Sequence, residues 1–521
     1  MDRQVSGRVR RLLPWAMLCL CLAASLLLYA RLGRHNMDAD RASEFVLAAH
    51  LNERGALVSP EWFYSTELRV VSPVPVYQLA LLLFPSWHAA RLFSIAVLMG
   101  LCTLSFLVLA RRAGFGEEAV YAAAAMVLPL GWTYAFLYSW GGFYTVYFSA
   151  SCWALTLVLS WRPGRWWVPV LLALLGVWCG LSGIRMLMMC ALPVGAAFLL
   201  RALGAQADRT RREQALMALV LCAGMAAGYG INARVLSRDF AFRSYGQVRC
   251  AAPSYVRLLQ ELDALCDFFG YRPGVALASG SGAVNLLVLV LVPSLLVLTG
   301  MAAVRHRGSS RGTLAQVALC AVGGGMVINS AAEGFPAAGT SVAYYILGIL
   351  LMLLMVFAWV SERTQGWLRS AALCTLTLAF AANALFYVRE EQTSRETARE
   401  KAAAWLVEQG YVHGYSTFWN GNVLTELSDG KLKLTCFGNF ASGAEPYEWL
   451  QTRESARGEF EGPLFVYTDD EEQQNDPTPL ADPKRLVYGE NGVQIYRYDS
   501  WEEVLRIQRE HVRGEGAGRP G

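Results

Sequence analysis

Apolar runs of membrane-spanning length recur along most of this chain, between residues 12 and 388. Each run is close to the roughly 20 residues that an α-helix needs to cross a bilayer. Charged residues make up 17% of the sequence, below the roughly 25% that is typical of soluble domains. We therefore predict a polytopic α-helical membrane protein with about eleven transmembrane helices. The predicted spans are 12–32, 89–110, 118–138, 142–161, 166–181, 184–202, 214–234, 282–304, 314–331, 341–360 and 368–388.

Arginines in the short loops predict the orientation of the chain in the membrane. The loops of one side carry arginines, whereas the short loops 139–141 and 332–340 of the other side carry no basic residue. Cytoplasmic loops are enriched in Lys and Arg, so the arginine-rich side and the N-terminus are predicted to be cytoplasmic. The loops 33–88 and 235–281 and the tail 389–521 are then extracytoplasmic, as in a multi-pass plasma-membrane protein. The net charge of +4 resides in such loops and does not indicate nucleic-acid binding.

The chain after residue 388 has the composition of a soluble domain. This change divides the protein into a membrane domain, 1–388, and a tail domain, 389–521. Helical and strand patterns alternate in the tail, which predicts a small α/β domain. The turn 490–492 (Glu-Asn-Gly) predicts a hairpin between the last two strands. We expect helices at 394–409, 447–456 and 501–510, and strands at 411–416, 431–437, 463–467, 485–488 and 493–496.

Two external segments are apolar without being long enough to span. Residues 74–86 contain Pro75 and Pro85 and are predicted to be a re-entrant or interfacial piece. From Tyr255 to Phe269, apolar residues recur on one face at helical spacing. Such a helix lies on the outer leaflet or packs on the neighbouring external loops, and the pattern leaves both open.

Cysteine usage indicates neither a zinc site nor a disulfide framework. Most of the twelve cysteines fall in predicted spans, where a thiol is an ordinary small apolar side chain. Cys250 and Cys266 share an external loop and could form a disulfide, although their spacing does not require one. No CxxC or HExxH motif occurs, so no structural zinc site is predicted.

An acidic motif, Asp38-Ala39-Asp40, directly follows the first predicted span. An aspartate at this position could simply cap the next helix by accepting backbone N–H bonds. A carboxylate at headgroup depth could instead deprotonate an acceptor hydroxyl, or hold a divalent cation against a phosphate. Asp38 and Asp40 are therefore candidate catalytic residues, and candidate ligands if a metal takes part. Glu44 lies one helical turn after Asp40 and is expected to share its face, which makes it a candidate substrate-binding residue.

The same external loop contains a stretch, 59–69, that mixes aromatic side chains with charged ones. Trp62 and Tyr64 could form part of an interfacial aromatic belt or line a groove for a sugar or an isoprenoid chain. Glu67 and Arg69 could pair with each other, and Arg69 could bind a phosphate. All four are candidate substrate-binding residues.

Arg185 lies inside an apolar run, at its predicted external end. A charged side chain in a membrane span is costly, which makes it a functional candidate. Its guanidinium could also extend to the nearby interface without any ligand. In the functional alternative, Arg185 would neutralise a phosphate on the same side of the membrane as Asp38.

In the tail, residues 413–430 predict a strand, a polar and aromatic loop and a short helix. Ligands often bind at strand ends in α/β domains. His413, Tyr415, Trp419 and Asn420 are candidate sugar-binding residues at such an end, although Trp419 could equally pack in the core.

The order of these features resembles the GT-C superfamily of integral-membrane glycosyltransferases. This superfamily includes the protein O-mannosyltransferases and the bacterial aminoarabinose and RgtA/B/C/D-like lipid A sugar transferases. The shared layout is a first span, a large external loop that opens with an acidic motif (here Asp38-Ala39-Asp40), many further spans and a soluble external tail. The stretch from Asp38 to Arg91, together with residues 414–420, resembles a bacterial branch of such proteins.

The resemblance implies a sugar donor carried on a polyprenyl phosphate and transfer with inversion outside the cytoplasm. It also implies an early-loop aspartate as the base, with Asp38 as the first choice and Asp40 as the second. The acceptor would be a cell-envelope glycan, lipid or protein. Alternatives are a transporter, flippase or polymerase of lipid-linked glycans and a membrane-anchored glycan-binding assembly protein. A transporter would need charged residues at mid-membrane depth, and the predicted spans have almost none.

Overall fold

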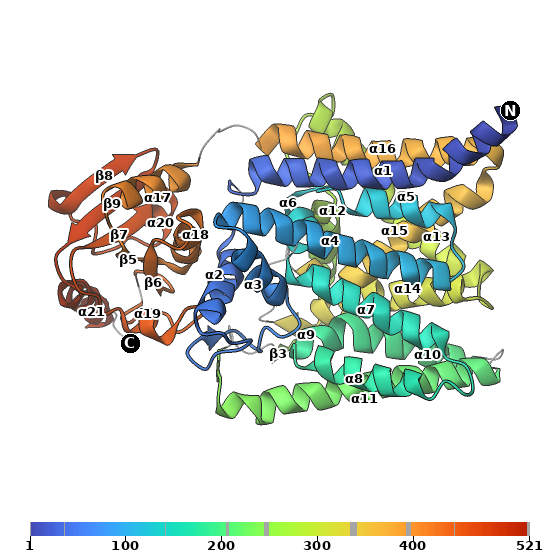
Figure 1. The fold of residues 1–521 in the computed structure, drawn as a ribbon, viewed down its shortest axis with the longest axis horizontal. Helices are drawn as coiled ribbons and strands as arrows, with labels where there is room; N and C mark the ends of the chain where they lie inside the picture. The colour runs from blue at the N-terminus through green and yellow to red at the C-terminus, as the bar shows by residue number, and fades with distance from the viewer. Residues whose placement is uncertain are drawn as a thin grey trace.

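A bundle of long helices and a smaller sheet domain at one end of it make up the protein (Figure 1). The computed structural model describes residues 2–35, 37–140, 142–204, 208–243, 249–333, 341–391, 397–441 and 443–517. The bundle contains α1 (Asp2–Leu32), α4 (Trp87–Arg112), α5 (Glu117–Met126), α6 (Trp132–Tyr134), α7 (Phe143–Ser160), α8 (Trp167–Gly180), α9 (Ile184–Met186), α10 (Leu192–Leu203), α11 (Arg209–Arg234), α13 (Gly280–Arg305), α14 (Ser310–Ser330), α15 (Ile346–Arg363) and α16 (Gly366–Glu391).

The number of spans differs from the prediction. Among the described residues, eight helices are long and apolar enough to cross a membrane, or nine if a bent helix pair counts as one span. The predicted span 118–138 is broken, because α5 ends shortly before Pro129 and Gly131 packs directly on Gly270. Its second half, α6 with the π-turn to Ser139, meets α7 at a bend of 57°.

The predicted span 166–181 forms α8, which has only 14 residues. It is nevertheless tightly integrated, because Gly176 and Gly180 face Gly224 and Gly228 of α11. Small residues at these positions let two helix backbones approach closely. The bundle therefore combines full-length spans with shorter helices.

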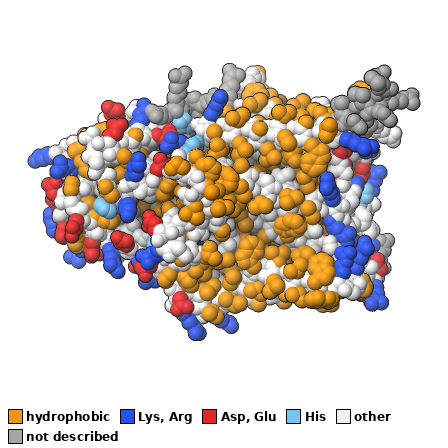
Figure 2. Space-filling model, viewed as in Figure 1, with side chains coloured by type: hydrophobic (Ala, Val, Ile, Leu, Met, Phe, Trp, Pro, Cys, Tyr) orange, Lys and Arg blue, Asp and Glu red, His pale blue; other side chains and the backbone are white. Residues whose placement is uncertain are grey.

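The two ends of the bundle differ in charge (Figure 2). Arg111, Arg112, Arg165, Arg305 and Arg311 all lie at helix ends or turns at one end, here called the arginine end. The opposite end, called the tail end, holds the C-terminal domain (Figure 1). Residues predicted to be external and residues predicted to be cytoplasmic thus lie at opposite ends. Which compartment each end faces stays a prediction.

The first external loop folds into two helices at the tail end, α2 (Ala39–Glu53) and α3 (Val74–Leu83). The segment 74–86, predicted to be re-entrant or interfacial, contains the short helix α3, which packs on α2 and α4. Two small strand pairs join the loops of this end: β1 (Phe63–Tyr64) with β2 (Ala241–Phe242), and β3 (Arg249–Cys250) with β4 (Ala332–Glu333).

The loop 235–281 contains the predicted one-faced helix, α12 (Tyr255–Phe268). Leu265 and Phe268 are buried and α12 packs on α14, whereas Tyr255 and Leu259 are exposed. The helix thus packs on its neighbours through one face and presents the other outward. Cys250 and Cys266 are free thiols, as are all twelve cysteines.

The tail domain is a five-stranded sheet in the order β6-β5-β7-β9-β8. β5, β6 and β7 are parallel, and β8 and β9 form the predicted hairpin, with Asn491 and Gly492 at positive φ in its turn. The predicted helix 447–456 is reduced to the five-residue α19. The elements are α17 (Ala398–Glu408), β5 (His413–Thr417), α18 (Phe418–Leu427), β6 (Lys433–Phe437), α19 (Arg453–Arg457), β7 (Leu464–Asp469), α20 (Asp470–Asn475), β8 (Leu486–Glu490), β9 (Val493–Tyr498) and α21 (Trp501–Ala517).

The tail domain is docked on the first external loop. One apolar cluster contains Phe45 and Tyr77 of the loop and Phe418 and Leu424 of the tail. Backbone hydrogen bonds join Phe63 to residues 450 and 451, at 2.8 and 2.9 Å. Burial of aromatic side chains together with paired backbone groups fixes the tail relative to α2.

Candidate active site

Asp38 caps α2. Its Oδ1 accepts hydrogen bonds from the backbone N–H groups of Asp40, at 2.8 Å, and Arg41, at 3.4 Å. This is the structural role that the sequence left open. Burial raises the pKa of Asp38 above its ordinary value, although Arg41 and the two cap bonds lower it. The cap bonds fix the orientation of the carboxylate, and its described hydrogen bonds use only Oδ1.

Asp40 and Glu44 lie on successive turns of α2, as the spacing predicts. Burial raises the pKa of Asp40 to about 6, with repulsion from Asp38 as the second cause. Burial also raises the pKa of Glu44 to about 7. Among the described residues, neither oxygen of Glu44 accepts a hydrogen bond, and its nearest cation is Arg69, at 3.6 Å. Both groups therefore titrate in the range that suits a general base.

A chain of ion pairs connects this face of α2 to the membrane bundle. Arg69 lies 3.6 Å from Glu44 and 3.8 Å from Glu67, and Arg185 donates to Glu67 at 2.8 Å. Gly183 makes the last pair possible, because it starts the arginine's helix at a φ of 68° and a Cβ there would lie 3.2 Å from Glu67. The sequence predicted Glu44, Glu67, Arg69 and Arg185 separately, and the fold brings them together.

A buried ion pair between α4 and α18 supports α2. Arg91, at the start of α4, forms a bidentate pair with Glu426 of α18 and donates to the backbone oxygen of Arg41 at 3.0 Å. Its guanidinium also lies over the rings of Phe45, at 4.4 Å, and Tyr77, at 5.1 Å. Sequence reasoning missed this pair. An arginine in the first turn of an apolar run was the available signal.

Two tyrosines of α7 were also missed. Tyr144 and Tyr147 are buried and interact electrostatically with Arg185 and Glu67. Their hydroxyl groups add hydrogen-bonding capacity beside the ion pairs. Little in the sequence indicated this, since aromatic residues at a span end are also typical of an interfacial belt.

The predicted aromatic substrate-binding residues are mostly placed elsewhere. Trp62 and Tyr64 have 0% and 1% exposure and pack in the cluster between loop and tail. Tyr415 is fully buried in the tail core and donates to the backbone oxygen of Gly458. These positions indicate packing, because a side chain without accessible surface cannot form the wall of an open groove.

The remaining tail candidates do not share one site. Trp419 is 53% exposed on α18, so it does not pack in the core. Asn420 is buried and donates to Glu472 at 2.8 Å and to Asp469 at 3.1 Å. His413 stacks on Phe460, with ring centroids 4.3 Å apart. The predicted loop after β5 is absent, because α18 begins directly at Phe418.

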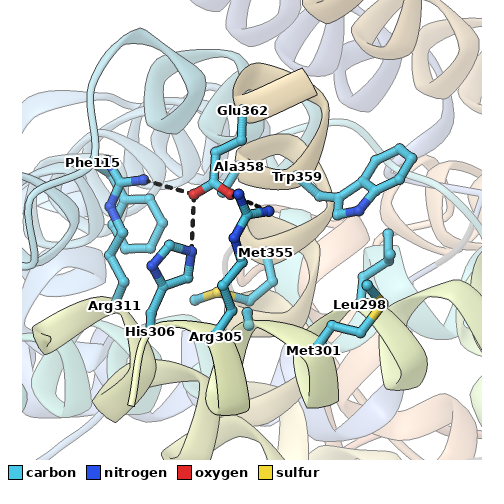
Figure 3. Close-up of a pocket in the computed structure, with 11 residues that line it drawn as sticks. Phe115, Leu298, Met301, Arg305, His306, Arg311, Met355, Ala358, Trp359 and Glu362 are labelled. Carbon is cyan, nitrogen blue, oxygen red and sulfur yellow. Dashed lines mark hydrogen bonds and ion pairs between the residues drawn. The ribbon is translucent and has the colours of Figure 1, made fainter. Parts of the chain in front are cut away.

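The arginine end contains a contrasting cluster (Figure 3). Glu362 of α15 is contacted by His306 at 3.0 Å, Arg311 at 3.2 Å and Arg305 at 3.5 Å. The cavity beside them has a volume of about 30 Å³, which is room for about one water. Each charge there has a partner, so this cluster stabilises the helix ends and offers no reactive group.

No group of three or more His, Cys, Asp or Glu side chains suited to hold a metal ion occurs in the described part of the chain. A metal bound by Asp38 and Asp40 therefore stays a prediction. The arrangement at the tail end can accept a proton and stabilise an anion, since Asp40 and Glu44, with raised pKa values, lie beside two arginines.

No protein-family model and no curated protein sequence matches this chain. Solved structures do. ArnT from Cupriavidus metallidurans in the apo state superposes with a TM-score of 0.56 at 11% identity, over 92% of this chain and 97% of that one. The same protein bound to undecaprenyl phosphate gives 0.53 at 12% identity, with the same coverage. The multi-pass bundle and C-terminal sheet domain predicted from the sequence are confirmed. The chain has the GT-C fold.

Proposed function

We propose that this protein is a membrane glycosyltransferase that moves a sugar from a polyprenyl-phosphate-linked donor to an acceptor hydroxyl of the cell envelope. The observation that carries the proposal is the set of carboxylates on α2, the half-buried Asp38 and Asp40 and the buried Glu44, beside the paired arginines Arg69 and Arg185. The fold supports it, because the similar ArnT structure was solved with undecaprenyl phosphate. The tail end would face the extracytoplasmic side.

In the proposed reaction, the donor phosphate lies near Arg185, whose side chain is 18% exposed, against 5% for Arg69. The acceptor oxygen forms a bond to the anomeric carbon as the bond from that carbon to the phosphate oxygen breaks. Asp38 takes the hydroxyl proton, and the polyprenyl phosphate leaves with the electron pair. Positioning and charge stabilisation provide most of the acceleration in such a displacement.

Asp38→Asn separates the catalytic role from the capping role. Asparagine caps a helix about as well as aspartate but cannot accept the proton. We expect transfer to fall by about 100-fold or more, with an unchanged thermal transition. The measurement is release of polyprenyl phosphate from synthetic polyprenyl-phosphate sugars by the full chain in nanodiscs. Asp263→Asn, an exposed acid on α12 at the same end, is the matched control.

Asp40→Asn tests the second candidate base. If Asp38→Asn transfers normally and Asp40→Asn does not, the base is Asp40. If both variants retain full transfer, the α2 carboxylates are not the base and the proposed mechanism is wrong. Analysis of lipid-linked sugars in a deletion strain complements the assay, because loss of a transferase should cause its donor to accumulate.

A further inference from the structure

A crevice separates the far half of α2 from the sheet domain. It has a volume of about 130 Å³. A cavity of about 150 Å³ can hold one six-membered ring. Its walls come from both parts of the protein, and those that matter here are His50, Glu53, Trp87, His413, Lys433 and Glu454. None of the α2 carboxylates proposed for catalysis lines it, so the interdomain crevice is a separate feature.

Several polar side-chain groups of the crevice have no partner among the residues that the structure describes. The side chains of Glu53, Lys433 and Glu454 are exposed, and within the described residues these side chains form no hydrogen bond or salt bridge. Nδ1 of His413 is buried without a hydrogen-bond partner. Other lining groups are occupied, such as Gln451, whose amide bonds the backbone of Cys436. The free groups can therefore bind a ligand without breaking internal contacts.

The apolar part of the lining is aromatic. Trp87 and Phe460 border the crevice, and the Phe460 ring stacks on His413. Pockets that combine apolar and aromatic surface with a few polar groups are typical of small-ligand sites. A sugar ring matches this combination, because it has apolar C–H faces and a rim of hydroxyl groups that need donors and acceptors.

The charge of the crevice restricts the kind of sugar. Two carboxylates, Glu53 and Glu454, face one ammonium group, Lys433. Burial lowers the pKa values of His50 and His413, so both rings are neutral at pH 7. A net negative lining disfavours phosphate or carboxylate ligands and suits neutral or amino-bearing sugars.

We propose that the interdomain crevice binds a neutral or amino sugar unit of a glycan, and that this glycan is the acceptor. The second half of this statement depends on the proposed transferase function, and the first does not. His50 lies ten positions after Asp40 on α2, which corresponds to about 15 Å along the helix. The crevice would therefore hold a sugar several units away from the reacting hydroxyl and select acceptors by length.

Binding is tested on the full chain in nanodiscs by saturation-transfer NMR. The probes are cellotetraose, mannotetraose, chitotetraose and its fully deacetylated form, with glucose 6-phosphate as the anionic probe. We expect saturable binding of at least one tetrasaccharide, weakened about tenfold or more by Glu454→Gln and by Lys433→Met. Lys484→Ala, an exposed residue outside the crevice, is the control and should bind normally.

Asp38→Asn separates the two proposals. If it binds the tetrasaccharide but does not transfer, the crevice and the catalytic site are both supported as distinct sites. In the transfer assay, Glu454→Gln should raise KM for a long acceptor at unchanged kcat and leave a monosaccharide acceptor unaffected. Absence of saturable binding for every tetrasaccharide, or tighter binding of glucose 6-phosphate, would overturn the proposal.

Discussion

The two ends of the bundle use the same residue types in opposite ways. At the arginine end, two arginines and a histidine surround the single carboxylate of Glu362 (Figure 3). At the tail end, the half-buried Asp40 and the buried Glu44 share one helix face, and Glu44 reaches its nearest arginine only at 3.6 Å. The first arrangement satisfies every charge. The tail end contains carboxylates whose ionisation costs free energy.

This difference indicates where chemistry is possible. An exposed ion pair contributes little to stability, so its protonation changes the stability of the protein little. A buried, incompletely paired carboxylate has a raised pKa, and such groups cluster at functional sites. The cost of the tail end is offset by its packing, since the tail domain closes over α2 through a shared apolar cluster.

Removing the carboxylate of Glu426 should have the largest effect on stability. Glu426→Ala leaves Arg91 buried and unpaired, at 1% exposure, which we expect to cost about 3–5 kcal/mol. The matched change at the other end, Glu362→Ala, should cost about 1 kcal/mol or less, because its partners are partly exposed. Thermal unfolding in detergent compares them. Equal losses of stability in the two variants would show that the two ends do not differ in how much their ion pairs contribute.

Removing Arg185 should reduce transfer strongly. Arg185→Ala takes away the more exposed of the two arginines proposed to stabilise the leaving phosphate, and we expect about a 100-fold loss of kcat. Arg185→Lys should restore part of the rate, since it keeps the charge but not the guanidinium geometry. Arg311→Ala at the arginine end is the control. A comparable rate loss in that variant would mean that the loss of transfer results from impaired folding and not from the loss of a phosphate-binding group.

The smallest predicted effect is a pH-dependent gain in stability. The pKa of native Asp40, about 6, exceeds its ordinary value of 3.8, so the native state binds this proton more tightly than the unfolded chain does. The resulting stabilisation is complete below about pH 4 and is lost as the pH rises through 6. Asp40→Asn should therefore be more stable than the wild type at pH 8, by about 1–2 kcal/mol.

Melting temperatures of both proteins at pH 4.5 and pH 8 provide the measurement. The difference should be largest at pH 8 and shrink at pH 4.5, where Asp40 is protonated. A difference that does not vary with pH would mean that the Asp40 carboxylate is not held at a raised pKa. The tail-end face of α2 would then resemble the arginine end.

The sequence predicted well those features that depend on local composition. Hydropathy located the apolar helices, because burial in a bilayer acts on each stretch separately. The 490–492 turn formed its hairpin, since Asn491 and Gly492 tolerate positive φ. The loop arginines lie at one end of the bundle. Asp38, Asp40 and Glu44 were predicted as site candidates because they follow a span at helical spacing, and their roles in the site stay predictions.

Contacts between distant parts of the chain were decided only by the tertiary structure. The break in 118–138 depends on the packing of Gly131 against Gly270, and the support of α2 depends on Glu426, 335 residues from Arg91. Trp62 packs in an apolar cluster that contains residues of both the first external loop and the tail domain, so neither part forms it alone. Hydropathy and turn chemistry are properties of a few neighbouring residues, so they can be read from the sequence. The pairing of a buried charge, and hence its pKa, exists only once both partners are packed together.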